Sequence, residues 1–343
     1  MTTKTLAFVA KVFVVCFLTL ACSGNKEQVK QNTDDSLSIR LAVLPVVDCL
    51  PYYYATNEGI YDSLGLHVEL DTYAAAMDAD TAFCKGHTDG IVTDMVKACI
   101  WKAAGDSVKV VMSGELKLYL MTAFSARIRQ TSSLKEKIIG ITRNSAVDMF
   151  TDELLWQARF VSTDLNKPQI NNLTLRCLMV DQNQYDGAVM PEPFASECEA
   201  RGARRIKSTD ELNLTLSAVV MRDSVLKAHK ENIHLLKEGY NIAVERINKL
   251  ISDYQAELND TTRLFGEPEA PTLMSYLPQD MRVEIPDSLV QYRKMSKATM
   301  PDDSTMARVV RWCKGRELLK KEFTASDLLY KKETTAKDNI TNK

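Results

Sequence analysis

A glutamate between two prolines is the first residue of this sequence whose surroundings indicate chemistry. In "DGAVMPEPFAS" (186–196) an apolar run typical of a buried strand ends at Pro191 and Pro193, with Glu192 between them. Proline fixes its own φ and biases the residue before it toward extended backbone, so the backbone aims this carboxylate. We therefore expect Glu192 to contact a ligand. The alternative is that it only complements the N-terminus of a helix starting at Phe194.

Other polar and aromatic residues follow strand-like runs. Acidic or hydroxyl side chains end three of these runs, and tyrosines, each with a flat ring and a hydroxyl, begin the helix after the first. Because ligands of open α/β sheets bind outside the carboxyl ends of the strands, these positions are expected to line a cleft. For the tyrosines, half-buried packing is the alternative. The candidate residues are Asp48, Tyr52, Tyr53, Thr93, Asp94, Gly114 and Glu115.

The segment "TRNSAVD" predicts the start of a helix. Ser145 with Asp148 three residues later fits a capping box, which would start the helix near Ala146 and direct its free amides into the cleft. A helix N-terminus attracts anions. Since Asp148 already occupies that field, an anionic ligand would need Arg143 as well.

Motifs of catalysis and of metal binding are not found in the sequence. It contains no HExxH, GxSxG or GxxxxGK[ST], and no GxGxxG that opens a helix after a strand. His229 and His234, five residues apart, are expected to be ordinary helix residues. We expect no catalytic residue, no metal and no cofactor, which favours a binding protein over an enzyme.

Composition indicates a globular protein, and the length is sufficient for two lobes. The 343 residues are 45% apolar and 26% charged, and 43 Lys plus Arg against 45 Asp plus Glu give a net charge of −2. Such a balance lacks the basic surface of a nucleic-acid-binding protein, so no nucleic-acid partner is expected.

The N-terminus predicts export and lipid anchoring. Lys4 and Lys11 accompany an apolar run too short for the roughly 20 residues of a membrane-spanning helix. The run ends in "LTLAC", which resembles a bacterial lipobox. We expect a signal peptide at 1–21, a lipidated Cys22 facing the periplasm and a flexible tether at 22–37. An ordinary signal peptide is the alternative.

Six cysteines remain after that processing. They show no CxxC pair, and they lie in apolar segments, so we expect mostly buried thiols, and one disulfide bond among them is the alternative. The six are Cys49, Cys84, Cys99, Cys177, Cys198 and Cys313.

From Ile39 onward, short apolar runs alternate with helical patterns, which indicates an α/β fold with mixed sheets. The expected strands are 39–47, 66–74, 89–93, 108–114, 137–142, 173–180, 186–190 and 204–208. The expected helices are 52–65, 77–87, 94–105, 146–160, 194–202, 223–251 and 303–323.

A short repeat suggests two similar lobes. "DGIVTDMVKA" starts at Asp89 and "DGAVMPEPFA" at Asp186. We expect a discontinuous lobe 1 (38–120 and 217–343), to which the last helices return, and a lobe 2 (121–216). Two strands, 117–124 and 214–221, would cross between them as a hinge.

Several segments together resemble a known family. "DCLPYYYATNEGIYDSLGLHVEL", "DGIVTD", "SLKEKIIGITRNSA", "YDGAVMPEPFAS" and "VVRWCKGRELLKKEFTASDLL" are similar, in order over most of 40–330, to the substrate-binding lipoproteins of ABC importers in the nitrate/sulfonate/taurine (SsuA/THI5-like) family. The resemblance implies a type II periplasmic-binding-protein fold and a monomer that delivers a small solute to a permease and its ATPase. It also implies ligand contacts at Glu192, at Asp48 to Tyr53 and at Asn144 to Ala146.

Charge suggests which solute. Asp48, Asp94, Glu115, Asp148 and Glu192 would crowd acidity near the cleft, with Arg143 as the main nearby cation, which favours a solute that donates hydrogen bonds or carries positive charge. An aminopyrimidine of the thiamine pathway is the preferred hypothesis, and taurine, an alkylsulfonate or nitrate is the alternative. An exported hydrolase or a THI5-like pyrimidine synthase is the alternative from another class.

Overall fold

The computed structural model describes residues 38–260 and 268–331. The expected signal peptide, the lipidated Cys22 and the tether lie outside the described residues, so they stay predictions. The described residues belong to one compact unit. Within the described part, no helix combines the length and the apolar character that a membrane span requires.

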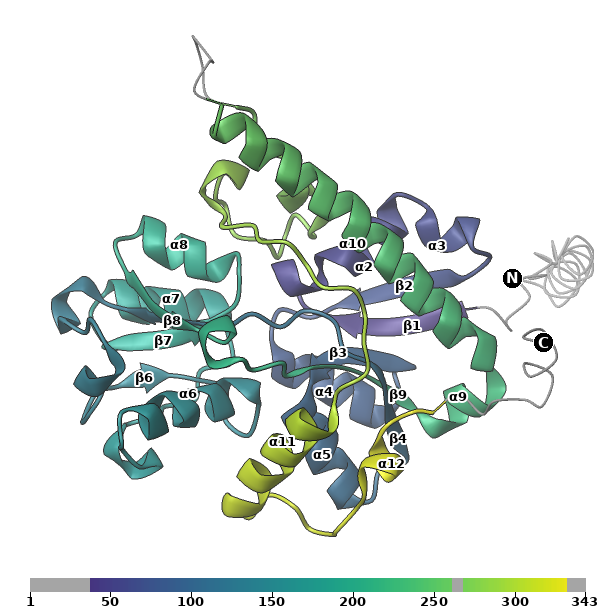
Figure 1. Cartoon of the computed structure of the whole chain (residues 1–343), viewed down its shortest axis with the longest axis horizontal. Coiled ribbons are helices and arrows are strands. Elements are labelled where there is room, and N and C mark those ends of the chain that lie inside the picture. The colour runs from purple at the N-terminus through teal and green to yellow at the C-terminus, as the bar shows by residue number, and fades with distance from the viewer. Residues whose placement is uncertain (1–37, 261–267, 332–343) are drawn as a thin grey trace, which may run out of the picture. The chain divides into compact units, whose positions relative to one another are not determined.

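The first of two sheets has five strands in the order β2-β1-β3-β9-β4 (Figure 1). β1, β2 and β3 are parallel, whereas β9 runs antiparallel to both β3 and β4. The strands span Ser38–Val43 (β1), His67–Thr72 (β2), Gly90–Asp94 (β3), Val108–Met112 (β4) and Ser217–Arg222 (β9). We call this sheet and its helices the first lobe. Because β9 joins it only after the second sheet is complete, the first lobe is discontinuous in sequence.

The second sheet has four strands in the order β6-β7-β5-β8. β6 is parallel to β7, and β5 is antiparallel to both β7 and β8. The strands span Tyr119–Thr122 (β5), Ile139–Gly140 (β6), Gly187–Met190 (β7) and Arg204–Ser208 (β8). We call this sheet and its helices the second lobe. The mixed α/β architecture with two lobes is therefore confirmed.

The repeated Asp-Gly motif occupies the same place in both sheets. Asp89 Oδ2 accepts a hydrogen bond from the Arg40 backbone N–H at 2.9 Å, and Asp186 Oδ2 accepts one from the Ile138 backbone N–H at 2.9 Å. The strand that begins at each motif, β3 or β7, has a parallel neighbour on one side and an antiparallel neighbour on the other. The motif thus marks equivalent central strands, each tied by its aspartate to the parallel neighbour.

Helices cover both sheets, and capping side chains define where several begin. Asp94 Oδ1 accepts from Lys97 N at 3.0 Å before α5, and Ser145 Oγ accepts from Val147 N at 3.2 Å before α6. The helices span Leu50–Asn57 (α2), Ile60–Ser63 (α3), Ala76–Lys85 (α4), Met95–Ala104 (α5), Ala146–Gln157 (α6), Leu173–Asp181 (α7), Phe194–Ala200 (α8), Asp223–Ala228 (α9), Lys230–Leu258 (α10), Asp303–Gly315 (α11) and Ala325–Leu328 (α12).

The expected strand at 173–180 is wrong, because this segment is α7. Asn172 caps the helix by accepting a hydrogen bond from Leu175 N at 2.8 Å. The buried side chains of the segment recur at three- and four-residue spacing, as on one face of a helix. A capping asparagine before an apolar run is a helix signal that the strand prediction overlooked.

Most of the expected helices differ from the observed ones by one to three residues at an end, and three differ more. The helix expected at 52–65 divides into α2 and α3 at Gly59, whose φ of 64° lies in the left-handed region that favours glycine. The stretch 223–251 divides into α9 and α10 at His229. The helix expected at 303–323 ends at Gly315.

The chain passes between the two sheets twice, at 113–118 and at 209–216. The two passages lie side by side, since Thr209 N donates to Leu118 O at 3.0 Å and Leu118 N donates to Thr209 Oγ1 at 3.2 Å. The expected crossing strand 117–124 therefore includes all of β5, and the expected crossing strand 214–221 includes most of β9. The expected lobe boundary at 120/121 falls inside β5.

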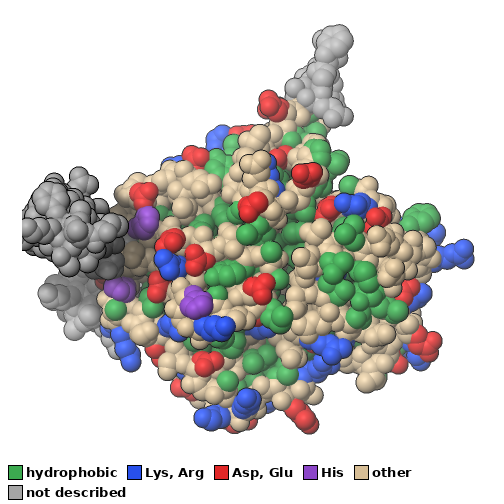
Figure 2. Space-filling model, turned by 180° about the vertical axis from the view of Figure 1, so that it is seen from behind, with side chains coloured by type: hydrophobic (Ala, Val, Ile, Leu, Met, Phe, Trp, Pro, Cys, Tyr) green, Lys and Arg blue, Asp and Glu red, His purple; other side chains and the backbone are tan. Residues whose placement is uncertain are grey.

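The last helices return to the first lobe. α10 packs on α2 and α3, and α11 packs on α5 (Figure 1). On the rear face, Figure 2 shows acidic and basic side chains interspersed, as the balanced composition suggests.

Candidate functional site

A hollow lies between the two lobes, where residues that follow β1, β3, β4, β6 and β7 come together. It holds about 880 Å³ free of protein atoms, including the part open to solvent. Six of the predicted site residues line it: Asp48, Thr93, Asp94, Glu115, Ser145 and Ala146. The ends of strands from both sheets thus meet at one site, as the strand-end argument expects.

The other predicted residues lie outside the lining of this hollow. They are Tyr52, Tyr53, Gly114, Arg143, Asn144 and Glu192.

The two tyrosines are buried within the first lobe. The Tyr52 ring lies 5.0 Å from the Tyr240 ring of α10. The Tyr53 hydroxyl makes hydrogen bonds with Leu44 O at 3.3 Å and Thr72 Oγ1 at 2.8 Å. Their contacts are those of packing residues.

Gly114 adjoins α10, where the added Cβ of any other residue would come within 2.7 Å of the Tyr240 hydroxyl oxygen. A side chain is therefore excluded at this position, and the next residue, Glu115, lines the hollow.

The residues before α6 are split between the hollow and solvent. Ser145 and Ala146 line the hollow, whereas Arg143 and Asn144 are exposed. Arg143 donates to Lys167 O at 3.0 and 3.2 Å. Asp148 accepts from the backbone N–H of Asn144 at 3.1 Å rather than from that of Ser145, so the predicted capping box has a different form.

Glu192 is 4% exposed, and protein groups bind both of its carboxylate oxygens. Oε2 accepts from Ser196 N at 3.0 Å in the first turn of α8, and Oε1 lies 2.7 Å from Arg205 Nη1. The side chain also borders a smaller hollow of about 280 Å³, which shares Asp48 and Glu115 with the main one. The bond to Ser196 is the helix-start contact of the alternative interpretation, whereas the pair with Arg205 of β8 belongs to neither interpretation.

Three charged residues that sequence reasoning missed also line the main hollow. Asp80 of α4 and Lys97 of α5 form an ion pair at 2.8 Å. Arg176 of α7 is fully buried and donates to Thr142 Oγ1 at 2.7 Å, Val189 O at 2.6 Å and Ile170 O at 3.0 Å. A lone arginine in the apolar run "LTLRCLMV" was the available signal.

Burial perturbs the carboxyl groups of the first lobe. It raises the pKa of Asp94 to about 6, although hydrogen bonds from the backbone N–H groups of Lys97 and Ala146 oppose the shift. Burial, followed by repulsion from Glu115, raises the pKa of Asp48 well above its usual range. Both groups would gain from a hydrogen-bond donor or a cation placed in the hollow.

The pKa of Asp94 predicts how its replacement changes pH-dependent stability. The folded pKa of about 6 exceeds the unfolded value of roughly 3.9, so the stability that protonated Asp94 contributes is lost as pH rises from about 4 to about 6. Asp94→Asn keeps a capping side chain and removes this titration. We therefore compare the free energy of unfolding of the variant with that of the wild type at each pH. Between pH 4 and pH 7 this difference should shift in favour of the variant by about 1–3 kcal/mol. Urea unfolding at the two pH values measures this, and a pH-independent difference contradicts it.

The described residues that line the hollow offer polar anchors for a solute. They contain no group of three or more His, Cys, Asp or Glu side chains that could hold a metal ion. The Ser145 hydroxyl donates to Thr142 O at 2.7 Å, which is not a general base. All six cysteines named above are free thiols, five of them buried and Cys84 exposed.

Solved structures show what this fold is similar to. The aliphatic sulphonate-binding protein SsuA of Escherichia coli has a TM-score of 0.64 and 15% identity, over 85% of this chain and 97% of that chain. The alkanesulfonate-binding SsuA of Xanthomonas axonopodis pv. citri, bound to MOPS, has a TM-score of 0.66 and 13% identity, over 86% and 98%. The nitrate-binding protein NrtA of Synechocystis PCC 6803 has a TM-score of 0.57 and 12% identity, over 79% and 75%.

No protein-family model matches the chain, and no curated protein matches it in sequence. The structural likeness, at low identity, establishes the fold: this chain has the two-lobed periplasmic-binding-protein fold of type II, with its candidate site between the lobes. The resemblance inferred from sequence motifs is thus confirmed in the fold, since the neighbours include SsuA and NrtA.

Proposed function

We propose that this chain is the solute-binding component of an ABC importer of the SsuA/THI5-like group, which captures a small solute between its lobes and delivers it to a membrane permease. The observation that carries the proposal is the hollow formed by strand ends of both sheets. Such a site is complete only when the lobes meet, so a solute that contacts both walls stabilises the closed arrangement.

Contacts across the hollow support a closure mechanism. Val47 N in the first lobe donates to Glu192 O in the second at 2.9 Å. Asp94, at the end of β3, and Ala146, at the start of α6, line the same hollow from opposite lobes. Opening of the hinge would break the Val47–Glu192 bond, and closure would restore it together with the solute contacts.

For the ligand, we propose a solute that is cationic or rich in hydrogen-bond donors, with an aminopyrimidine of the thiamine pathway as the preferred candidate. Asp48, Asp94 and Glu115 line the hollow, and burial raises the pKa of the first two. A donor between these carboxyl groups would replace the water that they lose when the lobes close.

An anionic solute, such as an alkylsulfonate, taurine or nitrate, is the second candidate. Arg176 favours it, because this buried guanidinium borders the hollow and, within the described residues, donates to carbonyl and hydroxyl oxygens rather than to carboxylates. The start of α6, at Ser145 and Ala146, lines the same wall and adds the positive end of a helix dipole.

Calorimetry with aminopyrimidines, taurine, alkylsulfonates and nitrate tests the proposal, together with mass spectrometry of small molecules that co-purify. We expect binding of an aminopyrimidine, weakened by about tenfold or more in Asp48→Asn. Asp253→Asn is the control, since its pair with Lys249 is exposed on α10. Tight alkylsulfonate binding with silent pyrimidines would reverse the ligand preference.

The same titrations separate a binding protein from an exported hydrolase or a pyrimidine synthase. A binding protein returns each solute unchanged, whereas an enzyme converts one of them, which NMR of the recovered solute detects. Conversion that depends on residues of the hollow would contradict the proposal. Lipidation of Cys22 and a periplasmic location complete the proposal, and mass spectrometry of the mature N-terminal peptide tests them.

A further inference from the structure

Helix α11 contacts helices of both lobes. Its buried side chains, Met306, Val309, Trp312 and Cys313, belong to the same apolar cluster as the buried residues of α5 in the first lobe. The same cluster contains buried residues of α6 in the second lobe, and polar side chains of α11 also bind α6. The helix therefore lies against an element from each side of the hollow.

Two side chains of α11, and that of Arg316 directly after the helix, make polar contacts with the second lobe. Arg308 binds Glu153 through two hydrogen bonds, Nε to Oε1 at 2.9 Å and Nη2 to Oε2 at 2.7 Å. Trp312 Nε1 donates to Asp152 Oδ2 at 2.9 Å. Paired hydrogen bonds from a planar guanidinium to a carboxylate restrict both distance and orientation.

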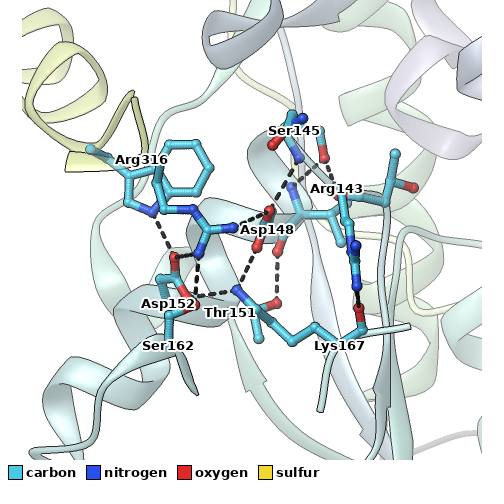
Figure 3. A network of polar contacts seen from close by, with 12 residues as sticks. Arg143, Ser145, Asp148, Thr151, Asp152, Ser162, Lys167 and Arg316 are labelled. Atoms are coloured by element: carbon cyan, nitrogen blue, oxygen red, sulfur yellow. Dashed lines mark hydrogen bonds and ion pairs between the residues drawn. The ribbon is translucent and has the colours of Figure 1, made fainter. Parts of the chain in front are cut away.

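Arg316 extends this contact into a buried charge network (Figure 3). It lies 3.5 Å from Asp148 and 3.6 Å from Asp152, and donates to Ser162 Oγ at 2.8 Å.

Asp148 and Asp152 are almost wholly buried and also bind Lys167 Nζ, at 2.6 and 2.7 Å. Two carboxylates thus face one lysine of their own lobe, and the second cation, Arg316, comes from the residue that directly follows α11. Without it, one buried negative charge in the network would be uncompensated.

The geometry connects this contact to closure. α5 contributes Lys97 to the hollow and is capped by Asp94 of β3, which also lines it, and α6 contributes Ala146 and Val147. These two helices cannot separate while α11 remains attached to both. Opening of the lobes must therefore break the polar contacts with α6 or the apolar contacts with α5.

We propose that α11 is an interlobe clamp, in which Arg308, Trp312 and Arg316 hold α6 against α5 and so set the balance between open and closed lobes. They are positioning residues, which act through α6 and do not line the hollow. The apparent affinity for a solute scales with the population of the binding-competent form. This consequence for affinity rests on the proposed function, whereas the clamp itself can be tested without a solute.

Hydrogen exchange of the full chain without added solute tests the clamp. The reporter is the backbone amide of Val47, whose hydrogen bond to Glu192 O crosses between the lobes. Neither residue belongs to α6 or α11, so local loosening of those helices leaves this amide protected. In Arg308→Ala/Arg316→Ala we expect about tenfold faster exchange at Val47, with β9 amides unchanged.

Arg311→Ala is the matched control, because it removes a cation from an exposed position of the same helix. We expect wild-type exchange at Val47 in this variant. Faster exchange only within α6 and α11, or no change, would overturn the clamp. If β9 amides also exchange faster in the double variant, the milder variant Arg308→Lys is measured instead. Unchanged exchange at Val47 in Arg308→Lys would overturn the proposal, and faster exchange at Val47 with unchanged β9 amides would support it.

Discussion

Replacement of Arg176 by leucine is expected to lower the free energy of unfolding by about 3–5 kcal/mol. The guanidinium is fully buried and donates to Thr142 Oγ1, Val189 O and Ile170 O. Two of these acceptors are backbone carbonyls that no side-chain change removes, so leucine leaves them without that donor, and each lost partner costs about 1–3 kcal/mol. Urea unfolding followed by circular dichroism measures the effect.

Arg201→Leu is the control for this experiment. Arg201 follows α8, and its side chain is 42% exposed, with pairs to Glu197 at 3.1 Å and Asp181 at 3.8 Å. Exposed ion pairs contribute about 0–1 kcal/mol, so this variant should unfold nearly as the wild type does. Equal losses in the two variants would show that the bonds of Arg176 do not stabilise the second lobe.

Replacement of Gly187 by alanine is expected to destabilise the fold by about 3 kcal/mol or more. Cβ atoms in proteins essentially never lie less than 3.0 Å from a heavy atom elsewhere in the chain, and an added Cβ at Gly187 would lie closer than that to the Met121 carbonyl oxygen. It would also lie 3.0 Å from Ile139 Cδ1. The first obstacle is backbone of β5, which cannot move without disturbing its pairing with β7. Thermal and urea unfolding measure the loss.

Two other glycines make a graded series with Gly187. At Gly90, the equivalent position of the first sheet, a Cβ would meet side-chain atoms of Leu41 and Met221 at 3.1 Å, which can shift. At Gly315, no atom lies within 4 Å. We expect Gly90→Ala to cost less than Gly187→Ala, and Gly315→Ala to be close to neutral. A different order would contradict the steric argument.

The sequence predicted several parts of the fold because they depend on local physics. Alternating apolar runs and helical periods led to the mixed α/β sheets, and Asp94 and Ser145 marked helix starts, because a cap acts within one turn. The same local signal was overlooked at Asn172, so α7 was predicted as a strand. The Asp-Gly motif was a correct indication of two similar sheets, since Asp89 and Asp186 each bind the neighbouring parallel strand.

The candidate site was predictable at the strand ends and not in the helices. Asp48, Asp94 and Glu115 follow strands, and the carboxyl ends of parallel strands meet at one edge whatever the helices do. Lys97 and Arg176 lie within helices, and the face that a helix turns to the site depends on its packing against the sheet.

By itself, the sequence determined the two-lobed α/β architecture and the strand ends that line the hollow, because hydrophobic period, caps and turns act over a few residues. Only the tertiary structure decided the partners of the charges. It brought Arg205 of β8 to Glu192, and Arg316, directly after α11, to Asp148. A buried charge is stabilised by whichever opposite charge the packed chain brings near, and that residue can be far away in sequence.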